Sequence, residues 1–276
     1  MSIWFITGAS RGFGAELTRA ALDRGHKVVA TARDAQQIRE RLPDAGDELL
    51  PVTLDVTDEV QIDAAVAAAI DAFGSIDVLI NNAGRGLLGA VEEATDAEVR
   101  SIYEVNVFAP LAIIRAVLPV MRHNADGTVI NISSVGGFAS AVGFGVYCST
   151  KFALEGYTEA LRDELAPLGI TAGIVEPGYF RTDFLDGTSL GVSSGIADYE
   201  SGPVADVRSV AASANHHQPG DPVKGAATIV DAVDSGSFPA RLFLGSDTLA
   251  SVGAKVDSVR AELDRQSSTA IATDHA

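Results

Sequence analysis

A tyrosine and a lysine four positions apart, Tyr147 and Lys151, are the residues in this chain best suited to proton chemistry. On a helix this spacing puts the phenol and the ammonium group on the same face. A phenol has a pKa of about 10, and a neighbouring cation lowers that value. We therefore expect the pair to donate and accept a proton near pH 7, with a solvated helix face as the alternative interpretation of the spacing.

Ser134 stands thirteen residues before Tyr147, at the end of an expected strand. A hydroxyl there can hydrogen-bond a carbonyl oxygen and stabilise the charge that develops on it. Ser133 ends the same strand, but neighbouring strand residues face opposite sides, and the spacing favours Ser134. Cys148 adjoins Tyr147 without a histidine nearby in the sequence, so we expect a buried packing residue and not a nucleophile.

A glycine-rich loop follows the first expected strand and opens the first expected helix, with the sequence Thr7-Gly8-Ala9-Ser10-Arg11-Gly12-Phe13-Gly14. Glycines allow a tight turn and a close approach of the backbone to a pyrophosphate, and a helix N-terminus offers free N–H groups and a favourable dipole. The spacing differs from both the G-x-G-x-x-G fingerprint and the Walker loop. Dinucleotide binding is favoured over a plain turn, through Gly8, Ser10, Arg11, Gly12, Phe13 and Gly14.

The end of the second expected strand, Ala32-Arg33-Asp34, bears on the choice of cofactor. An acidic residue there binds the ribose 2′-hydroxyl of NAD, whereas an arginine accommodates the 2′-phosphate of NADP. Arg33 can pair with that phosphate, and Arg11 can reach it from the glycine loop, since guanidinium groups match phosphate geometry. We expect NADP over NAD. Two surface arginines are the alternative, and one step of register would bring Asp34 to the ribose instead.

Short β-rich runs alternate with longer helical patterns, which indicates βαβ units and a parallel sheet. Near-continuous apolar strands are typical of a sheet covered by helices on both faces. The expected strands are residues 3–6, 27–31, 50–54, 77–80, 127–132, 170–175 and 241–244. The expected helices are residues 12–24, 35–41, 59–73, 96–122, 145–166, 221–235 and 247–265. This pattern predicts an α/β fold: a Rossmann-type, doubly wound parallel sheet in three α/β/α layers, forming a single domain over residues 1–265.

Two regions depart from the alternation. Residues 183–220 are rich in glycine and serine, and an insertion of this length in a compact domain is usually a lid or a binding loop. A disordered surface loop is the alternative. Residues 266–276 are polar, and we expect them to form a frayed C-terminal tail.

Composition narrows the classes of partner. The chain has 20 basic and 37 acidic residues, a net charge of −17, which repels nucleic acid and anionic membranes. No apolar run approaches the roughly 18 residues of a membrane helix, and the N-terminus lacks the basic region of a secretory signal. With Cys148 as the one cysteine, we expect a cytoplasmic protein. His216 and His217 lack spaced ligand partners, so no metal site is expected.

Together these motifs resemble the compact branch of the short-chain dehydrogenase/reductase family over nearly the whole chain. The resemblance extends to Asp55-Val56, Asn81-Asn82-Ala83-Gly84, Asn106, Pro177-Gly178 and Thr182. Gly220-Asp221-Pro222 and Gly245-Ser246-Asp247 further resemble a bacterial subgroup of NADP-dependent reductases. Beyond the glycine loop and Arg33, the family resemblance implies cofactor contacts at Asp55, Val56, Asn82, Ala83, Gly84, Tyr147, Lys151, Pro177, Gly178 and Thr182.

The resemblance also implies a mechanism. Tyr147 would protonate the developing alkoxide, and Ser134 would hydrogen-bond the carbonyl oxygen. Lys151 would lower the pKa of Tyr147 and hold the nicotinamide ribose. Asn106 would hold a water that links Lys151 to solvent, although a helix-kink role is the alternative. The resemblance further implies a homodimer or homotetramer, often packed through the helices that contain Asn106 and Tyr147.

We therefore expect an NADPH-dependent reductase of small or medium ketones and aldehydes, equally a secondary alcohol dehydrogenase in reverse. NAD-dependent alcohol oxidation and a non-catalytic NADP sensor are the alternatives. The substrate pocket is expected to be apolar, with a lining of Gly136, Phe138, Ala139, Phe144, Tyr179, Phe180, Phe184 and Leu185.

Overall fold

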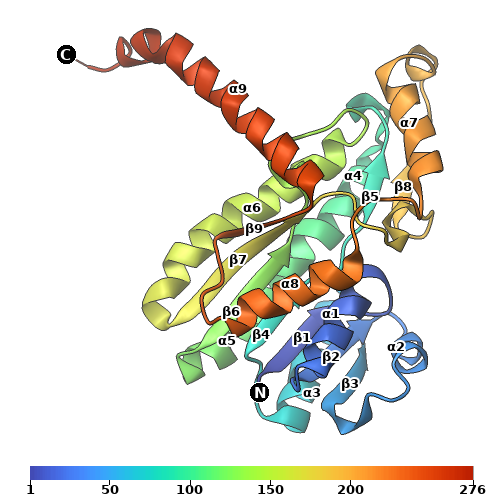
Figure 1. Cartoon of the computed structure of the whole chain (residues 1–276), viewed down its shortest axis with the longest axis vertical. Helices are drawn as coiled ribbons and strands as arrows, with labels where there is room; N and C mark the ends of the chain where they lie inside the picture. Colours follow the sequence, from blue (N-terminus) through green and yellow to red (C-terminus); the bar gives the residue numbers. More distant parts are fainter. Residues whose placement is uncertain (276) are drawn as a thin grey trace.

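The strands of the main sheet are all parallel in this computed structural model, which describes residues 1–275 (Figure 1). Over those residues the sheet has seven strands in the order β3-β2-β1-β4-β6-β7-β9. Because the order reverses between β1 and β4, the sheet is doubly wound, as the alternation of strands and helices predicted. The strands are β1 Ile3–Thr7, β2 Lys27–Ala32, β3 Leu49–Thr53, β4 Val78–Asn81, β6 Gly127–Ile132, β7 Ile170–Pro177 and β9 Arg241–Leu244.

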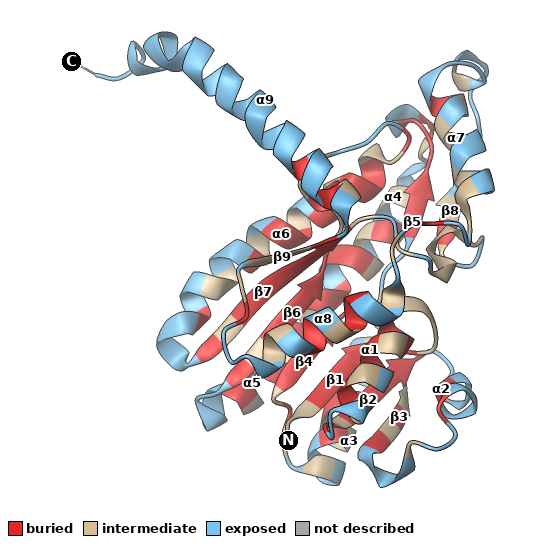
Figure 2. Ribbon diagram, viewed as in Figure 1, coloured by how far each residue is buried: buried red, intermediate tan, exposed pale blue. Residues whose placement is uncertain are grey.

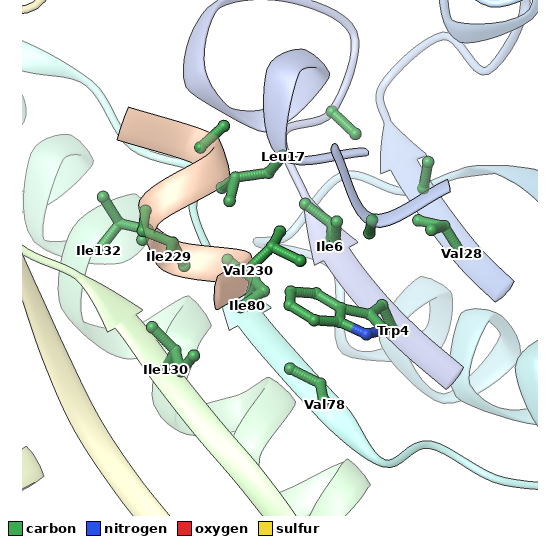
Figure 3. Packing of buried hydrophobic residues seen from close by; sticks show 14 of the residues in the cluster. Trp4, Ile6, Leu17, Val28, Val78, Ile80, Ile130, Ile132, Ile229 and Val230 are labelled. Carbon is green, nitrogen blue, oxygen red and sulfur yellow. The ribbon is translucent and has the colours of Figure 1, made fainter. Parts of the chain in front are cut away.

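Helices cover both faces of this sheet and bury a separate apolar cluster on each side. The two-residue period of β1 shows the division, because Trp4 and Ile6 join one cluster and Phe5 joins the other. Figure 3 shows Val230 of α8 and Ile80 beside Trp4 and Ile6, and Ile229 beside Ile132, all in the first cluster. The helices of the first face are α1 Gly12–Asp23, α2 Gln36–Arg41 and α8 Pro222–Asp234, and those of the second are α3 Glu59–Phe73, α5 Ala109–Asn124 and α6 Gly145–Leu165.

Local signals at the chain's turns explain where several helices begin and end. The Asp58 carboxylate accepts hydrogen bonds from the backbone N–H groups of Val60 and Gln61 at the start of α3. That helix ends at Gly74, whose φ of 87° is a left-handed conformation that favours glycine. Asp221 caps α8 in the same way, with Pro222 in the first turn.

Asn106 lies in an interruption of the long helical stretch expected over residues 96–122. The structure divides it into α4 (Asp96–Tyr103), a π-helical turn (Glu104–Phe108) and α5. Residues Asp96–Asn124 are also long and apolar enough to cross a membrane, by length and composition only, with a mean hydropathy of 1.6. Half of that apolar window is buried inside the protein, as is usual for a core helix. The π-turn matters for the site because such turns are frequent at functional positions.

The expected insertion at residues 183–220 is folded rather than a featureless loop. It contains the short strand β8 (Leu190–Val192), which pairs in parallel with β5 (Gly86–Leu88), and the helix α7 (Pro203–Ala214). A buried ion pair of 2.6 Å joins Arg208 of α7 to Glu93. We call residues 183–220 the substrate segment.

The final helix, α9 (Ser246–Ile271), leaves the body of the domain and extends away from it (Figure 2). The expected helix ended at residue 265 and a polar tail was expected over residues 266–276, but the helix continues to Ile271. Residues 266–271 are therefore helical, and residue 276 lies outside the described residues.

Candidate active site

A cavity of about 830 Å³ opens at the carboxyl ends of the parallel strands, beside the point where the strand order reverses. It gathers nearly all of the residues expected to bind cofactor or to act in catalysis. Those that line it are Gly8, Ser10, Arg11, Gly12, Phe13, Arg33, Asp55, Val56, Asn82, Ala83, Gly84, Ser134, Tyr147, Lys151, Pro177, Gly178 and Thr182. Gly14 and Asn106 are not part of the lining.

The glycine loop is shaped by close backbone contacts. Gly8 has a φ of 67°, and a Cβ there would lie 2.9 Å from the Cα of Ala83. A Cβ on Gly14 would lie 2.3 Å from the carbonyl oxygen of Gly8, so Gly14 allows α1 to pack against the loop. The Asn82 amide donates to the carbonyl oxygens of Thr7 (2.9 Å) and Gly8 (3.1 Å). The segment after β4 therefore holds the loop after β1 in place.

The N-terminus of α1 fits the pyrophosphate of a dinucleotide. Arg11 occupies the position before the helix in an extended conformation, and no side chain of the described residues caps the first turn. Backbone N–H groups at such a terminus need an acceptor, and the helix dipole favours an anion there. Because these groups border the cavity beside Gly8 and Gly12, the residues present suit the phosphates of NAD(P).

Arg33 and Asp34 differ in what they face. Arg33 is exposed and lines the cavity just after β2. Asp34 instead accepts from the backbone N–H of Gln36 (3.0 Å) and from the Gln37 amide (3.3 Å). The Asp34 carboxylate therefore organises the start of α2, and it does not line the cavity.

Arg11 already has partners, which the sequence did not suggest. Its guanidinium donates to the Thr188 hydroxyl at 2.7 Å and to the Ser189 hydroxyl at 2.8 Å. Both acceptors belong to the substrate segment. Arg11 thus joins the phosphate loop to the wall of the substrate pocket. Arg33, the other arginine expected to bind the 2′-phosphate, lines the cavity without a hydrogen bond to the substrate segment among the described residues.

Ser134, Tyr147 and Lys151 come together at the inner end of the cavity. The Ser134 hydroxyl lies near enough to the Tyr147 phenol to lower its pKa, and the hydroxyl oxygen accepts from the backbone N–H of Gly136 at 3.0 Å. The Lys151 ammonium donates to the carbonyl oxygen of Ile132 at 2.8 Å, which fixes it at the end of β6. The thirteen-residue and four-residue spacings thus place a hydroxyl, a phenol and an amine side by side.

Burial dominates the proton affinities of this group. It raises the pKa of Tyr147 well above its ordinary value, and the nearby Ser134 hydroxyl offsets part of that rise. Burial lowers the pKa of Lys151 to about 8, against the opposing effect of Glu155. The expected lowering of the Tyr147 pKa is therefore wrong for the protein by itself, because burial is the largest effect on that pKa and raises it.

Asn106 is fully buried, with both ends of its side-chain amide engaged. It donates to the carbonyl oxygen of Arg85 (2.9 Å) and to the Thr150 hydroxyl (3.0 Å), and it accepts from the backbone N–H of Arg85 (3.0 Å). These bonds join the segment after β4 to α6 through the π-turn. They support the structural alternative for Asn106, and its role in holding a water stays a prediction.

The outer part of the cavity is apolar, as expected. The Tyr147 ring packs against Phe144 and Phe184, with ring centroids 6.2 and 5.5 Å away. The expected lining residues that border the cavity are Gly136, Ala139, Phe144, Tyr179, Phe180, Phe184 and Leu185. Phe138 does not border it, because its ring packs under the Arg241 guanidinium at 5.2 Å.

Gln218 was missed by the sequence analysis, although it lines the cavity and is 3% exposed. No residue pattern around it distinguishes it from the polar loop in which it lies. The Nε2 atom of His216, two positions before Gln218, lies 3.3 Å from a carboxylate oxygen of Asp186. The possible ligand atoms of Asp183, Asp186 and His216 lie within 4.8 Å of one another, so His216 has the acidic neighbours that the sequence analysis did not find. The Asp186 carboxylate also accepts a hydrogen bond from the Asn215 amide, so two neighbouring side chains, Asn215 and His216, contact it.

A buried charge network beneath the site was also missed. Arg241 contacts Glu155, Glu159 and Glu176, the last at 2.6 Å, and Ser133 donates to Glu155 at 2.6 Å. Glu155 stands four residues after Lys151, a spacing that could have placed it on the same helix face. The network holds Ser133, the neighbour of Ser134, from behind.

The glycine loop, the uncapped start of α1 and the Ser–Tyr–Lys group define a dinucleotide-dependent oxidoreductase on a doubly wound sheet. A family model described as short chain dehydrogenase matches residues 2–191. The chain belongs to the short-chain dehydrogenase/reductase family and is an NAD(P)-dependent oxidoreductase of that family.

Its similarity to known proteins extends over most of the chain. Oxidoreductase BOA17 of Botryotinia fuckeliana is 36% identical over 252 residues, 91% of each chain. A 3-ketodihydrosphingosine reductase of Bacteroides thetaiotaomicron is 39% identical over 193 residues, 70% of this chain and 69% of the relative. The crystal structure of a short-chain dehydrogenase from Streptomyces avermitilis superposes with a TM-score of 0.92 at 41% identity, over 99% of this chain and all of that one.

Proposed function

We propose that the protein reduces the carbonyl group of an apolar ketone or aldehyde with NADPH, and oxidises the corresponding secondary alcohol in reverse. The observation that carries this proposal is the convergence of Ser134, Tyr147 and Lys151 with the glycine loop in one cavity of about 830 Å³. A buried acid at the end of a dinucleotide-sized groove suits hydride transfer coupled to proton transfer.

Residues at different places in the cavity would bind the cofactor, donate the proton and hydrogen-bond the substrate oxygen. NADPH, when bound, supplies the hydride. The loop around Gly8 and Gly12 would hold its pyrophosphate, and Lys151 would hold the nicotinamide ribose. Burial keeps the Tyr147 phenol protonated at neutral pH, so it can donate its proton to the carbonyl oxygen as negative charge develops there. The Ser134 hydroxyl donates a second hydrogen bond to that oxygen.

Loss of the Tyr147 hydroxyl tests the catalytic role. In Tyr147→Phe we expect NADPH oxidation with a ketone panel to fall by about 10²- to 10⁴-fold, the usual contribution of a positioned general acid, while NADPH binding persists. Tyr157→Phe is the matched control, since Tyr157 lies on the same helix and its buried hydroxyl has no partner among the described residues. Full activity in Tyr147→Phe would refute the mechanism.

The preference for NADPH is supported by Arg33 at the cavity and by the use of the Asp34 carboxylate at the start of α2. Loss of one charge-assisted phosphate contact should weaken NADPH binding about 10- to 100-fold in Arg33→Ala and leave NADH binding unchanged. Arg39→Ala, an exposed arginine on α2 that does not line the cavity, is the control. Tighter binding of NADH than NADPH to the unaltered protein would favour NAD-dependent alcohol oxidation.

The substrate class rests on the apolar wall formed by Phe144, Phe184 and Leu185 beside Tyr147. Similarity to a relative named as a 3-ketodihydrosphingosine reductase supports a keto substrate. Activity rising along a series of ketones with lengthening alkyl chains would fit this wall, and preference for charged keto acids would contradict it.

We also propose a homodimer or homotetramer in the cytoplasm. Exposed aromatic side chains at Phe108 and Phe152, on the π-turn and α6, support contacts between copies, and the single buried Cys148 suits a reducing compartment. Light scattering and cell fractionation test the two statements. A monodisperse monomer, or recovery outside the cytoplasmic fraction, would contradict them.

A further inference from the structure

Helix α9 projects from the domain for most of its length (Figures 1 and 2). Its first two turns are anchored, because Thr248 is fully buried and Val252 is 9% exposed. The Asp247 carboxylate in the first turn also accepts from the backbone N–H of Tyr179 at 2.7 Å. Every residue from 253 to 275 is exposed, so the rest of the helix contacts little of its own chain.

Helix α9 carries an apolar stripe with a seven-residue repeat, and every member of it except Val252 is exposed. Its members alternate by three and four positions, the spacing of the a and d positions of a coiled coil. They are Leu249, Val252, Val256, Val259 and Leu263, and we call them the α9 stripe. Val256, Val259 and Leu263 are 47%, 40% and 60% exposed, which is more apolar surface than a lone helix normally offers to water.

The helix also lacks the composition to stand alone. Gly253 and the valines of the stripe are poor helix formers, and residues 266–269 add two serines and a threonine. Helices without tertiary packing are marginal in water even when their sequences are rich in alanine. A partner that covers the stripe would stabilise helical structure as far as Ile271.

We propose that α9 pairs with α9 of a second copy of this chain as an antiparallel two-stranded coiled coil. Lys255 and Glu262 flank the stripe at equivalent positions of successive repeats. Antiparallel pairing puts each Lys255 beside Glu262 of the other copy, twice in one symmetric interface. Parallel pairing would instead put Lys255 beside Arg260 of the other copy, which is repulsive. Charge complementarity thus favours α9 of a second copy as the partner of the α9 stripe, and it favours the antiparallel direction.

This pairing has a definite register. With Lys255 opposite Glu262, Val256 faces Val259 of the second copy. This contact occurs twice about the two-fold axis, so the exposed centre of the stripe is self-complementary. Gln266 falls at the next core position, where a polar residue helps to fix the register at some loss of stability.

The other occupants of the stripe fit less well. A helix that lies on a membrane carries an excess of basic residues on its polar face. Residues 246–271 have three basic and four acidic side chains instead, in a chain with a net charge of −17. The direction of α9, away from the sheet, leaves the stripe beyond Val252 out of reach of its own domain (Figure 2).

Particle mass gives the first test. Val256→Glu places a charge in the centre of the stripe and should halve the mass measured by light scattering. Ala261→Glu adds the same charge on the opposite face of α9 and should leave the mass unchanged. Circular dichroism of both variants shows whether the domain is still folded. Since Phe108 and Phe152 offer a second contact between copies, both variants are made in a Phe108→Glu/Phe152→Glu background. An unchanged mass in folded Val256→Glu in that background would overturn the proposal in favour of a free helix or a different partner.

Charge reversal tests the direction. Lys255→Glu and Glu262→Lys should each weaken dimerisation about 2- to 30-fold at low salt, since two exposed ion pairs are lost, and the double variant should restore it. Tighter dimers in Lys255→Glu would indicate parallel helices and overturn the antiparallel arrangement.

Cross-linking tests the register independently. The double variant Val256→Cys/Val259→Cys should form a disulfide between copies under oxidation, while each single variant should not. Cys148 is buried and should not react. Cross-linking of a single variant would contradict the register, because it requires identical positions to face each other.

Discussion

Glu176 should make the stability of this protein depend on pH in a way that one substitution removes. It is fully buried at the end of β7, 2.6 Å from Arg241, and Glu155 shares the same guanidinium. Burial, with the repulsion of Glu155 and Glu159, raises the pKa of Glu176 from 4.5 to about 7. The Arg241 cation thus contacts two buried carboxyl groups, Glu155 and Glu176, and Glu176 keeps its proton up to a pH of about 7.

The size and sign follow from that shift. Between pH 4.5 and about 7 the folded protein keeps a proton that the unfolded chain has released, so stability falls as pH rises. At 1.36 kcal/mol per pKa unit, the loss is up to about 3 kcal/mol. The side chain of Glu176→Gln is neutral at every pH, so the variant does not lose this stability as the pH rises. The variant should therefore gain up to about 3 kcal/mol over the unaltered protein between pH 4.5 and 8.

Urea unfolding followed by circular dichroism at several pH values between 4.5 and 8 measures this difference. Glu159→Gln is the control, because Glu159 contacts the same arginine but its side chain is 63% exposed. Its pH dependence should stay close to that of the unaltered protein, because Glu159 contributes less to the raised pKa of Glu176 than burial and Glu155 do. Parallel stability curves for Glu176→Gln and the unaltered protein would refute the idea of a proton retained at Glu176.

Three further changes have expected outcomes. The burial that lowers the pKa of Lys151 to about 8 should make carbonyl reduction fall about tenfold per pH unit above that value, and a flat rate to pH 9.5 would contradict this. Gly14→Ala, whose new Cβ meets the Gly8 carbonyl oxygen at 2.3 Å, should lose about 1–3 kcal/mol of stability in thermal unfolding and bind NADPH more weakly; a variant with unchanged melting and affinity would argue against close packing there. Glu93→Ala frees Arg208 and should make the substrate segment sensitive to limited proteolysis, whereas an unchanged digestion pattern would show that other contacts hold it.

Local sequence patterns predicted the sheet and most of the candidate site, because these features are determined by residues that are close to one another in the sequence. The glycine loop, the Tyr147–Lys151 pair and Ser134 each lie within a single strand–turn–helix unit, where spacing determines which face a side chain takes. The parallel sheet then brings the ends of β1, β4 and β6 to one edge without further information.

Features that depend on distant contacts could not be predicted in the same way. Arg11 meets Thr188, and Arg241 meets Glu155, across large separations in sequence. The pKa of Tyr147 depends on how completely the folded chain excludes water, which no spacing reveals. Residues 266–271 were expected to form a tail because they are polar, but the helix that begins at Ser246 continues through them to Ile271.

The link from Arg11 to Thr188 and Ser189 has a consequence for how this protein can evolve or be redesigned. A substitution at position 11 that altered the choice of dinucleotide would also release the wall of the substrate pocket. A substitution of Arg11 therefore affects the choice of cofactor and the choice of substrate at the same time. Arg33 lies outside that contact, and it is the position at which cofactor choice can drift while substrate choice stays constant.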